Sequence, residues 1–348
     1  MERKSLKDIS WNVTEAEYRV DPALSQSTLT RYEREGFNNL SKLFDKIESP
    51  SLTFGSAVDC LITGNEEEFN ERFLVAQLDN PPSDALVNIT KTIFNVWKDK
   101  YDNLLEIPDD VILNTLEAAD ITWNNHWLPK TRVKKIKEDC VSYYKLLFLA
   151  EERTILNTDT YREVLNTVDK LHLADSTRFY FEQDSIFDKS IERFYQLKFK
   201  ATFNNVNYRG MADLLIVFHD NKLVVPIDLK TSSKPEWDFY KSFIEWGYGC
   251  QARLYWRLIR YNMDQDEYFK DFKLADYRFI VINKKTLTPL VWVFDNTQTK
   301  GDIILKDGTV LRDPFTIGEE LNNYLVNKSI VPNGIDLIKP NKLEDWIL

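Results

Sequence analysis

The chain is 348 residues long, with 29% charged and 43% hydrophobic residues, which is ordinary for a globular protein with a large buried core. No run approaches the roughly 18 apolar residues of a membrane span. The charged N-terminus leads into no apolar signal region, so we expect a cytoplasmic protein without a membrane partner. The three cysteines and three histidines are scattered, which argues against disulfides, a zinc site and an iron–sulfur cluster. Any metal is then held by oxygen, which favours Mg²⁺ or Mn²⁺.

Helical patterns dominate residues 1–83, which we expect to form an N-terminal helical part of the core. Ser25 or Ser27 is suited to cap the start of one helix, and Gly36 marks its end. Asp59 falls inside a later, mostly apolar helical stretch. An acid buried there needs a partner. The alternative is a partly exposed aspartate near the helix N-terminus, where the helix dipole favours it.

A helical insertion or cap is predicted over residues 84–175, after the break at Asn80-Pro-Pro-Ser. Within it, residues 130–137 form a basic cluster in a chain whose formal net charge is −10. A local basic surface is sufficient for binding phosphate, whatever the net charge. The alternative, which charge runs usually favour, is a solvated helix face.

The predicted core, residues 176–300, contains a β-hairpin over residues 207–230. Two apolar runs flank the polar group His219-Asp220-Asn221-Lys222, which is typical of two strands and a turn. Proline cannot donate a ladder hydrogen bond, so Pro226 favours a four-residue loop over a two-residue one. We also expect a bulge or a local edge where Pro226 faces the next strand.

This register places Asp213 directly opposite Asp228. Two facing carboxylates repel each other unless a cation lies between them. Strand alternation puts Lys230 and Arg209 on the same face as these aspartates. The pattern indicates a divalent-metal site with a cationic helper, and the alternative is an ordinary surface hairpin with solvated charges.

A long helix is predicted from about Trp237 to Tyr261, followed by strands at 276–282 and 289–295. The C-terminal extension, residues 301–348, contains a predicted helix at 317–328. Three residues of the long helix share one face, which also fits an ordinary aromatic core stripe: Tyr248, Gln251 and Tyr255. The element order predicts an α/β or α+β core, with a mixed β-sheet flanked by helices.

Asp213 and Asp228-Leu-Lys230 together resemble the signature of the PD-(D/E)XK nuclease superfamily. More specifically, the chain resembles the RecE-type exonucleases of phages and prophages. The matching pieces, in family order, are Glu15-Ala-Glu-Tyr-Arg-Val-Asp-Pro-Ala-Leu-Ser25-Gln-Ser27, Phe54-Gly55-Ser-Ala-Val58, Glu68-Phe-Asn-Glu-Arg-Phe-Leu-Val, Gly210-Met-Ala-Asp213, Asp228-Leu-Lys-Thr-Ser and Tyr248-Gly-Cys-Gln251-Ala-Arg-Leu-Tyr255. The resemblance implies a restriction-endonuclease-like core with a helical insertion.

The resemblance also implies roles for individual residues. Asp213, Asp228, the Leu229 carbonyl and Asp59 would hold Mg²⁺ or Mn²⁺, although the family usually has histidine at the position of Asp59. Lys230 would orient or deprotonate the attacking water.

Four further residues are implied around the reaction, namely Glu192, Gln251, Tyr255 and Arg209. Glu192 would support the metal or the water indirectly. Gln251 and Tyr255 would line the site and contact DNA, and Arg209 would contact a phosphate. For each of the four the alternative is a residue that only braces the site.

The implied activity is a Mg²⁺-dependent exonuclease that hydrolyses linear double-stranded DNA. Its implied setting is phage-type recombination in the bacterial host cytoplasm, with the gene carried by a phage or prophage. The implied partners are a single-strand annealing protein and further copies of the chain in a ring. Two alternatives stay open from the residues. One is an endonuclease or DNA-repair nuclease of the same superfamily, and the other is a non-catalytic DNA-binding protein that keeps the fold.

Overall fold

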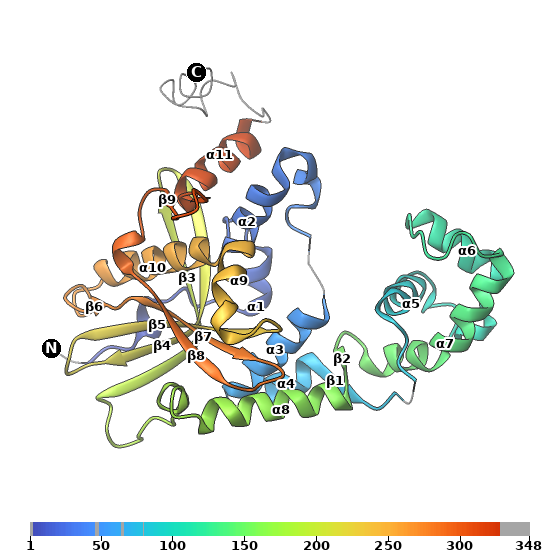
Figure 1. The fold of residues 1–348 in the computed structure, drawn as a ribbon, viewed down its shortest axis with the longest axis horizontal. Helices are drawn as coiled ribbons and strands as arrows, with labels where there is room; N and C mark the ends of the chain where they lie inside the picture. Colours follow the sequence, from blue (N-terminus) through green and yellow to red (C-terminus); the bar gives the residue numbers. More distant parts are fainter. Residues whose placement is uncertain (1–2, 46–48, 64–65, 79, 328–348) are drawn as a thin grey trace. The chain divides into compact units, whose positions relative to one another are not determined.

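The computed structural model describes residues 3–327, apart from 46–48, 64–65 and 79. The chain divides into two compact units (Figure 1). The first consists of the residues up to Ser49 and those from Asp169 onward, and the second is Pro50–Val168. The second unit therefore begins before residue 84, where the helical insertion was predicted to start.

The first unit is built on a mixed β-sheet with the strand order β3-β4-β5-β7-β8, and β6 also pairs with β5. The strands β3, β4 and β5 are antiparallel, β5 and β7 are parallel, and β7 and β8 are antiparallel. This arrangement, with helices packed on the sheet, is the predicted mixed α+β class. The strands are β3 (Ile191–Phe203), β4 (Val206–Phe218), β5 (Leu223–Ser232), β6 (Lys273–Leu274), β7 (Tyr277–Asn283) and β8 (Pro289–Phe294), with a separate small pair β9 (Ile303–Ile304) and β10 (Val310–Leu311).

The hairpin β4–β5 has the predicted four-residue loop and the predicted register. Its pairs run from Phe218↔Leu223 at the loop to Leu215↔Pro226 and Leu214↔Ile227. On its other edge β5 pairs with β6 up to Val224 and with β7 only from Ile227. Pro226 therefore lies in the gap between two neighbours, which confirms the expected local edge because proline has no N–H to offer there.

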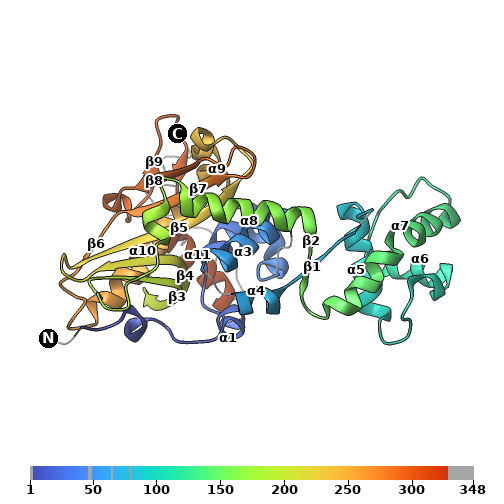
Figure 2. The ribbon, with the colours of Figure 1, turned by 90° about the horizontal axis from the view of Figure 1, so that it is seen from below.

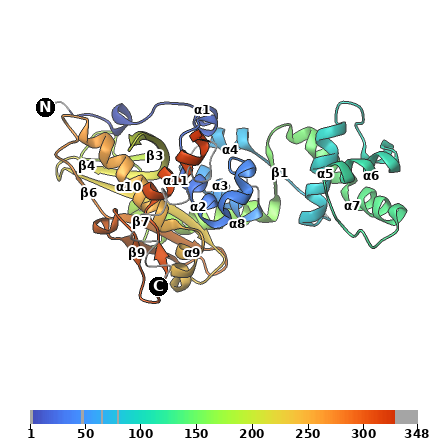
Figure 3. The same cartoon turned by 90° about the horizontal axis from the view of Figure 1, so that it is seen from above.

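The helix α10 (Tyr248–Asp264) packs on β3 and β4 (Figures 2 and 3). Its apolar residues Leu254 and Leu258 join a core that also contains Leu24 and Leu29 from the N-terminal part of the chain. The other helices of this unit are α1 (Glu15–Val20), α2 (Gln26–Glu35), α9 (Phe239–Glu245) and α11 (Pro314–Asn327), with 3-10 turns at Leu6–Ile9, Gly36–Lys42, Arg178–Phe181, Glu236–Asp238 and Asn296–Gln298.

The long helix predicted from Trp237 is broken into α9 and α10. Gly247 has φ +64°, a backbone conformation that side-chain-bearing residues rarely adopt. A Cβ at Gly247 would lie 2.6 Å from Cγ2 of Thr30, so α2 approaches the chain closely at this break. In α2 the predicted cap is confirmed, because the Ser25 hydroxyl accepts a hydrogen bond from the Thr28 N–H at 3.3 Å.

The second unit contains mostly helices and has its own core. The parallel strands β1 and β2 pair from Phe73↔Thr154 to Ala76↔Asn157, although β2 lies in a region predicted to be helical. This pairing and the packing of α3, α4 and β1 explain why the unit begins at Pro50. Its elements are α3 (Pro50–Ile62), α4 (Glu66–Arg72), β1 (Phe73–Ala76), α5 (Asp84–Trp97), the 3-10 turn Leu104–Glu106, α6 (Asp109–Ala118), α7 (Pro129–Ala150) and β2 (Thr154–Asn157), and α8 (Thr158–Leu173) runs from this unit into the first.

Within the described ranges, none of the helices is long and apolar enough to cross a membrane.

Candidate functional site

The ladders of the sheet open at Asp213. On one side, β3 and β4 pair at Tyr195↔Leu214 and Leu197↔Ala212 but not at the position between, where Gln196 would meet Asp213. Gln196 has φ +55°, a left-handed conformation that costs a non-glycine residue about 1–2 kcal/mol. On the other side, the last pair between β4 and β5 is Leu214↔Ile227, so the pairing stops next to Asp213.

The Asp213 carboxylate takes the place of the missing ladder bond to β5. Its Oδ2 accepts a hydrogen bond from the Leu229 backbone N–H at 3.0 Å. A strand residue points its N–H and its carbonyl to the same side. The Leu229 carbonyl therefore also faces the side on which the Asp213 carboxylate lies, which supports the predicted grouping of these two oxygen donors.

Asp228 is fully buried, and both of its carboxylate oxygens face a polar partner. The Gln251 Nε2 donates to Oδ1, so α10 is tied to β5 at this point. The Lys230 ammonium forms an ion pair with Oδ2. That oxygen accepts no hydrogen bond of good geometry among the described residues, so Lys230 contributes charge more than a well-directed hydrogen bond.

Lys230 is held between Asp228 and an aromatic ring. Its Nζ lies 5.0 Å from the centre of the Tyr248 ring, within the range of a cation–π contact. Burial acts to lower the pKa of Lys230, but the negative charges of Asp228 and Asp213 outweigh it and raise the pKa above its ordinary value. Lys230 is therefore a cation at neutral pH in this arrangement. We call Asp213, Asp228 and Lys230 the carboxylate cluster.

Tyr255 packs against the strand that carries Asp213. A Cβ at Gly210 would lie 2.7 Å from both Cδ1 and Cε1 of Tyr255, so only glycine allows this approach. Burial raises the pKa of the Tyr255 phenol well above its ordinary value, and the negative charges of Asp228 and Asp213 add to this effect. The phenol therefore stays protonated and can donate a hydrogen bond.

The face of α10 predicted from spacing is confirmed. Tyr248, Gln251 and Tyr255 contact, in turn, Lys230, Asp228 and the strand of Asp213. Gln196 was not predicted as a site residue, and Gly210 was named only as part of a matching motif. Gly210 had one usable signal, because a glycine inside an apolar strand often marks a close approach by another group.

Glu192 is not brought to the carboxylate cluster. It lies four residues along β3 from Gln196, about 13 Å at the usual rise per strand residue. Its Oε2 is 2.7 Å from Nε2 of His219, whose Nδ1 is 2.9 Å from the Tyr268 hydroxyl. Glu192 thus braces the hairpin loop in this structure, which is the alternative to the indirect support of the metal or the water that the resemblance implied.

Arg209 is also directed elsewhere. Its guanidinium donates to backbone carbonyls of Tyr18 and Ala23 and lies 4.5 Å from the centre of the Tyr18 ring. It is buried and binds the end of α1 and the segment that follows. This contact holds the N-terminal part of the chain to β4, and it differs from the phosphate contact that was predicted.

Asp59 lies on α3 in the second unit and is half-buried. Its role as a metal ligand stays a prediction.

The donor set of the carboxylate cluster fits a hard divalent cation. Among the described residues, no three side chains of His, Cys, Asp or Glu lie close enough to hold a metal ion. Mg²⁺ does not need three, because it is usually bound through one or two carboxylates and keeps several waters. Asp213, Asp228 and the Leu229 carbonyl supply such a set of oxygens. The Asp228 Oδ2 is buried and faces the Lys230 ammonium, so a bound cation would share this oxygen with Lys230.

Comparison with known proteins gives likenesses to solved structures but no sequence family. No family model matches the chain. No curated protein matches it significantly. The structure is similar to a crystal structure of a candidate exonuclease from Eubacterium rectale, with a TM-score of 0.46 and 12% sequence identity. The likeness covers 92% of this chain and 88% of that one.

Proposed function

We propose that the protein is a metal-dependent deoxyribonuclease of the PD-(D/E)XK superfamily. The observation that carries the proposal is the carboxylate cluster itself, in which two aspartates and a lysine from adjacent strands meet where both ladders open. An ordinary surface hairpin would leave these charges in solvent, whereas here Asp228 is fully buried. Buried, paired charges in an interrupted sheet are characteristic of a functional site.

Phosphodiester hydrolysis requires an activated water and neutralisation of the charge that develops on the phosphate. Asp213, Asp228 and the Leu229 carbonyl would hold Mg²⁺ or Mn²⁺, which supplies Lewis-acid activation when it is bound. Lys230, fixed as a cation, orients the attacking water and stabilises negative charge on the phosphate oxygens.

The residues of α10 hold this geometry. Gln251 fixes the Asp228 carboxylate in one orientation, since its amide donates to one oxygen and leaves the other facing Lys230. Tyr255 offers a protonated hydroxyl close to the strand of Asp213, where it can donate to a phosphate oxygen. Side chains that are held by packing in this way lose little freedom when the substrate binds.

The specific activity that we propose is exonucleolytic digestion of linear double-stranded DNA, as in the RecE-type enzymes that the motifs resemble. The test is to incubate the purified chain and Mg²⁺ with linear and with covalently closed circular duplexes. Digestion of the linear DNA alone, abolished by EDTA, is the expected result.

Cutting of the closed circle would instead establish the endonuclease alternative. If neither duplex is cut and the Asp228→Asn variant behaves like the unchanged chain, the proposed hydrolysis of duplex DNA is wrong.

Assembly into a ring and cooperation with a single-strand annealing protein belong to the same proposal. A ring would keep the enzyme on one DNA molecule over many cycles. Light scattering of the purified chain tests this point, and a monomer would contradict the ring without affecting the proposed chemistry.

A further inference from the structure

The first turns of α7 carry the densest positive charge in the chain. Five basic residues occur between residues 130 and 137, and no acidic residue occurs from 121 to 137. This density contrasts with the net charge of −10 for the whole chain. The opposite face of the helix is buried in the core of the second unit through Val133, Ile136 and Cys140. The basic side chains are therefore on the outside of a folded unit.

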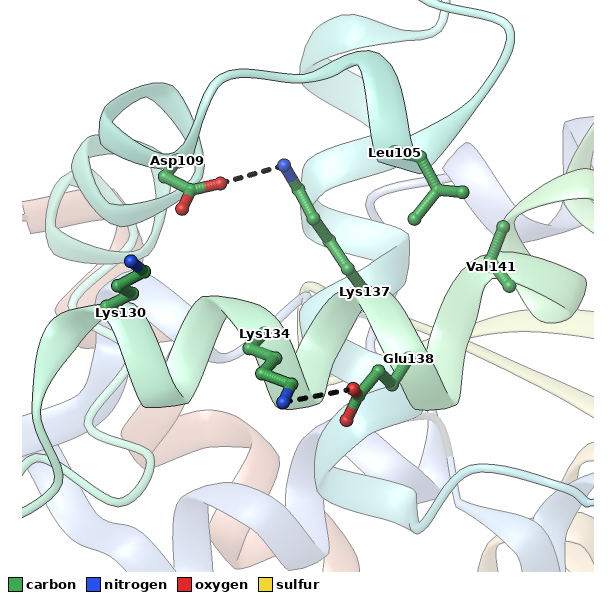
Figure 4. Close-up of a pocket in the computed structure, with 7 residues that line it drawn as sticks. All are labelled: Leu105, Asp109, Lys130, Lys134, Lys137, Glu138 and Val141. Carbon is green, nitrogen blue, oxygen red and sulfur yellow. Dashed lines mark hydrogen bonds and ion pairs between the residues drawn. The ribbon is translucent and has the colours of Figure 1, made fainter.

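Three of these lysines, Lys130, Lys134 and Lys137, line a hollow of the second unit (Figure 4). Figure 4 shows them following one another along α7, with Lys137 reaching Asp109 of α6 and Lys134 turned to Glu138. The hollow has a volume of about 450 Å³ and is open to solvent; its other lining residues are Leu105, Asp109, Glu138 and Val141.

The charges on this face are only weakly engaged. Lys134 lies 3.7 Å from Glu138, and both side chains are more than half exposed. Lys137 lies 2.8 Å from Asp109, which is also more than half exposed. Within the described part of the chain, Lys130 makes no ion pair. The exposed Lys134–Glu138 pair contributes little to stability, so a phosphate group can replace its carboxylate at small cost, whereas the Lys137 side chain is only 18% exposed and is held more firmly.

Aromatic side chains stand directly before this basic face. Trp127, two residues before the start of α7, is 36% exposed and lies 5.8 Å from the ring of Trp123 in an edge-to-face contact. His126 makes a similar contact with Trp127 at 6.1 Å. The Trp127 backbone N–H donates to the Asn124 carbonyl at 2.9 Å, so the backbone at Trp127 lies in a turn. The turn therefore leaves part of a large aromatic ring exposed to solvent.

We propose that this basic–aromatic surface, formed by Trp127, Lys130, Lys134 and Lys137, binds single-stranded DNA. Lysines that follow one another along a helix face suit the phosphates of one strand, and a partly exposed tryptophan three residues before Lys130 in the chain suits an unpaired base. In a duplex the bases are stacked on each other, so Trp127 would have no partner there. The surface lies in the second unit, and this inference goes beyond the proposed hydrolysis, because it needs no metal and no cleavage.

The experiment measures the anisotropy of a fluorescently labelled oligothymidylate with the full chain in EDTA, where hydrolysis does not occur. The double variant Lys130→Glu/Lys134→Glu should bind at least tenfold more weakly. It should also lower the slope of log K against log salt by about 1.4, because each phosphate contact on a single strand contributes about 0.7. Trp127→Ala should weaken binding of the oligothymidylate about tenfold, while Trp127→Phe should largely preserve it.

The matched control is Lys145→Glu, a charge reversal at another exposed lysine of the same helix, which should leave binding unchanged. Circular dichroism confirms that each variant is folded. The inference is overturned if the double variant binds as the unchanged chain does, or if Lys145→Glu weakens binding as much as the double variant. It is also overturned if Trp127→Ala weakens a labelled duplex as much as the oligothymidylate. If the unchanged chain binds the oligothymidylate as expected but does not digest DNA with Mg²⁺, only the proposed function is contradicted.

Discussion

Positive charge is used differently in the two units of this protein. In the first unit, Lys230 is held against the fully buried Asp228 and a tyrosine ring, and Arg209 is buried among backbone carbonyls. On α7, Lys134 and Lys137 pair with exposed carboxylates, and Lys130 makes no ion pair among the described residues. A cation with one fixed partner can act on a single atom of a substrate, whereas a cation with an exchangeable partner can follow a flexible ligand. The proposed roles of these cations therefore differ because of their burial and their partners, since all of them carry the same charge.

Asp228→Asn tests most directly whether the buried charges of the first unit serve the proposed hydrolysis. This change keeps the shape of the side chain but removes the charge that faces Lys230, so the rate of DNA digestion should fall by about 10³-fold or more. Gel-based assays of linear duplex with Mg²⁺ measure this rate. Asp159→Asn, on an exposed ion pair with Arg162, is the control and should digest DNA at the unchanged rate. A variant at Asp228 that retains full activity would show that the cluster is structural.

Arg209→Ala separates scaffolding from chemistry among the buried cations. The change leaves carbonyls at the end of α1 without their donors, and the free energy of unfolding should fall by about 2–3 kcal/mol. Urea denaturation measures this loss. At a temperature where the variant is folded, the salt dependence of DNA binding should be unchanged. A slope reduced by about 1 would mean that Arg209 contacts a phosphate after all.

Gly210→Ala tests how closely α10 must approach the site strand. The added Cβ would overlap the Tyr255 ring, so we expect a loss of about 1–3 kcal/mol in the free energy of unfolding, together with slower digestion. In a Tyr255→Ala background the same substitution should cost much less, because the overlapping ring is gone. Equal costs in both backgrounds would show that the effect does not come from this contact.

Gln196→Gly is expected to have the smallest effect. Glycine adopts φ +55° without strain, so the free energy of unfolding should rise by up to about 1 kcal/mol. Thermal denaturation measures the gain. If digestion slows while stability rises, the strained residue opposite Asp213 has a role in the reaction. A loss of stability would show that the Gln196 side chain makes contacts worth more than the strain.

Local rules were sufficient to predict the hairpin. The turn residues and Pro226 set its register, and the spacing of Tyr248, Gln251 and Tyr255 set the helix face that meets it. Contacts between distant segments could not be predicted in this way. The carbonyl of Tyr18, which Arg209 binds, is 191 positions away in the sequence, and no pattern near Arg209 reveals it.

The organisation of the units depended on similar long-range contacts. The break at Gly247 depends on Thr30, which approaches from another helix. The start of the second unit depends on a four-residue parallel pairing between β1 and β2, too short for a clear periodic signal. Short strands that pair across many residues are therefore the elements that the sequence could not reveal.

The pairing of Leu24 with Tyr208 has a consequence for the synthesis of the chain. The Leu24 N–H donates to the Asn207 carbonyl at 2.8 Å, so a segment that is synthesised early pairs with a strand that is synthesised late. At 5–20 residues per second, the ribosome adds the intervening residues in roughly 10–40 s. Until Tyr208 has been added, Leu24 and Leu29 have no sheet to pack on, whereas the second unit is complete earlier, once Val168 has been added. Chaperones that bind exposed apolar segments would meet the N-terminal region of this chain first.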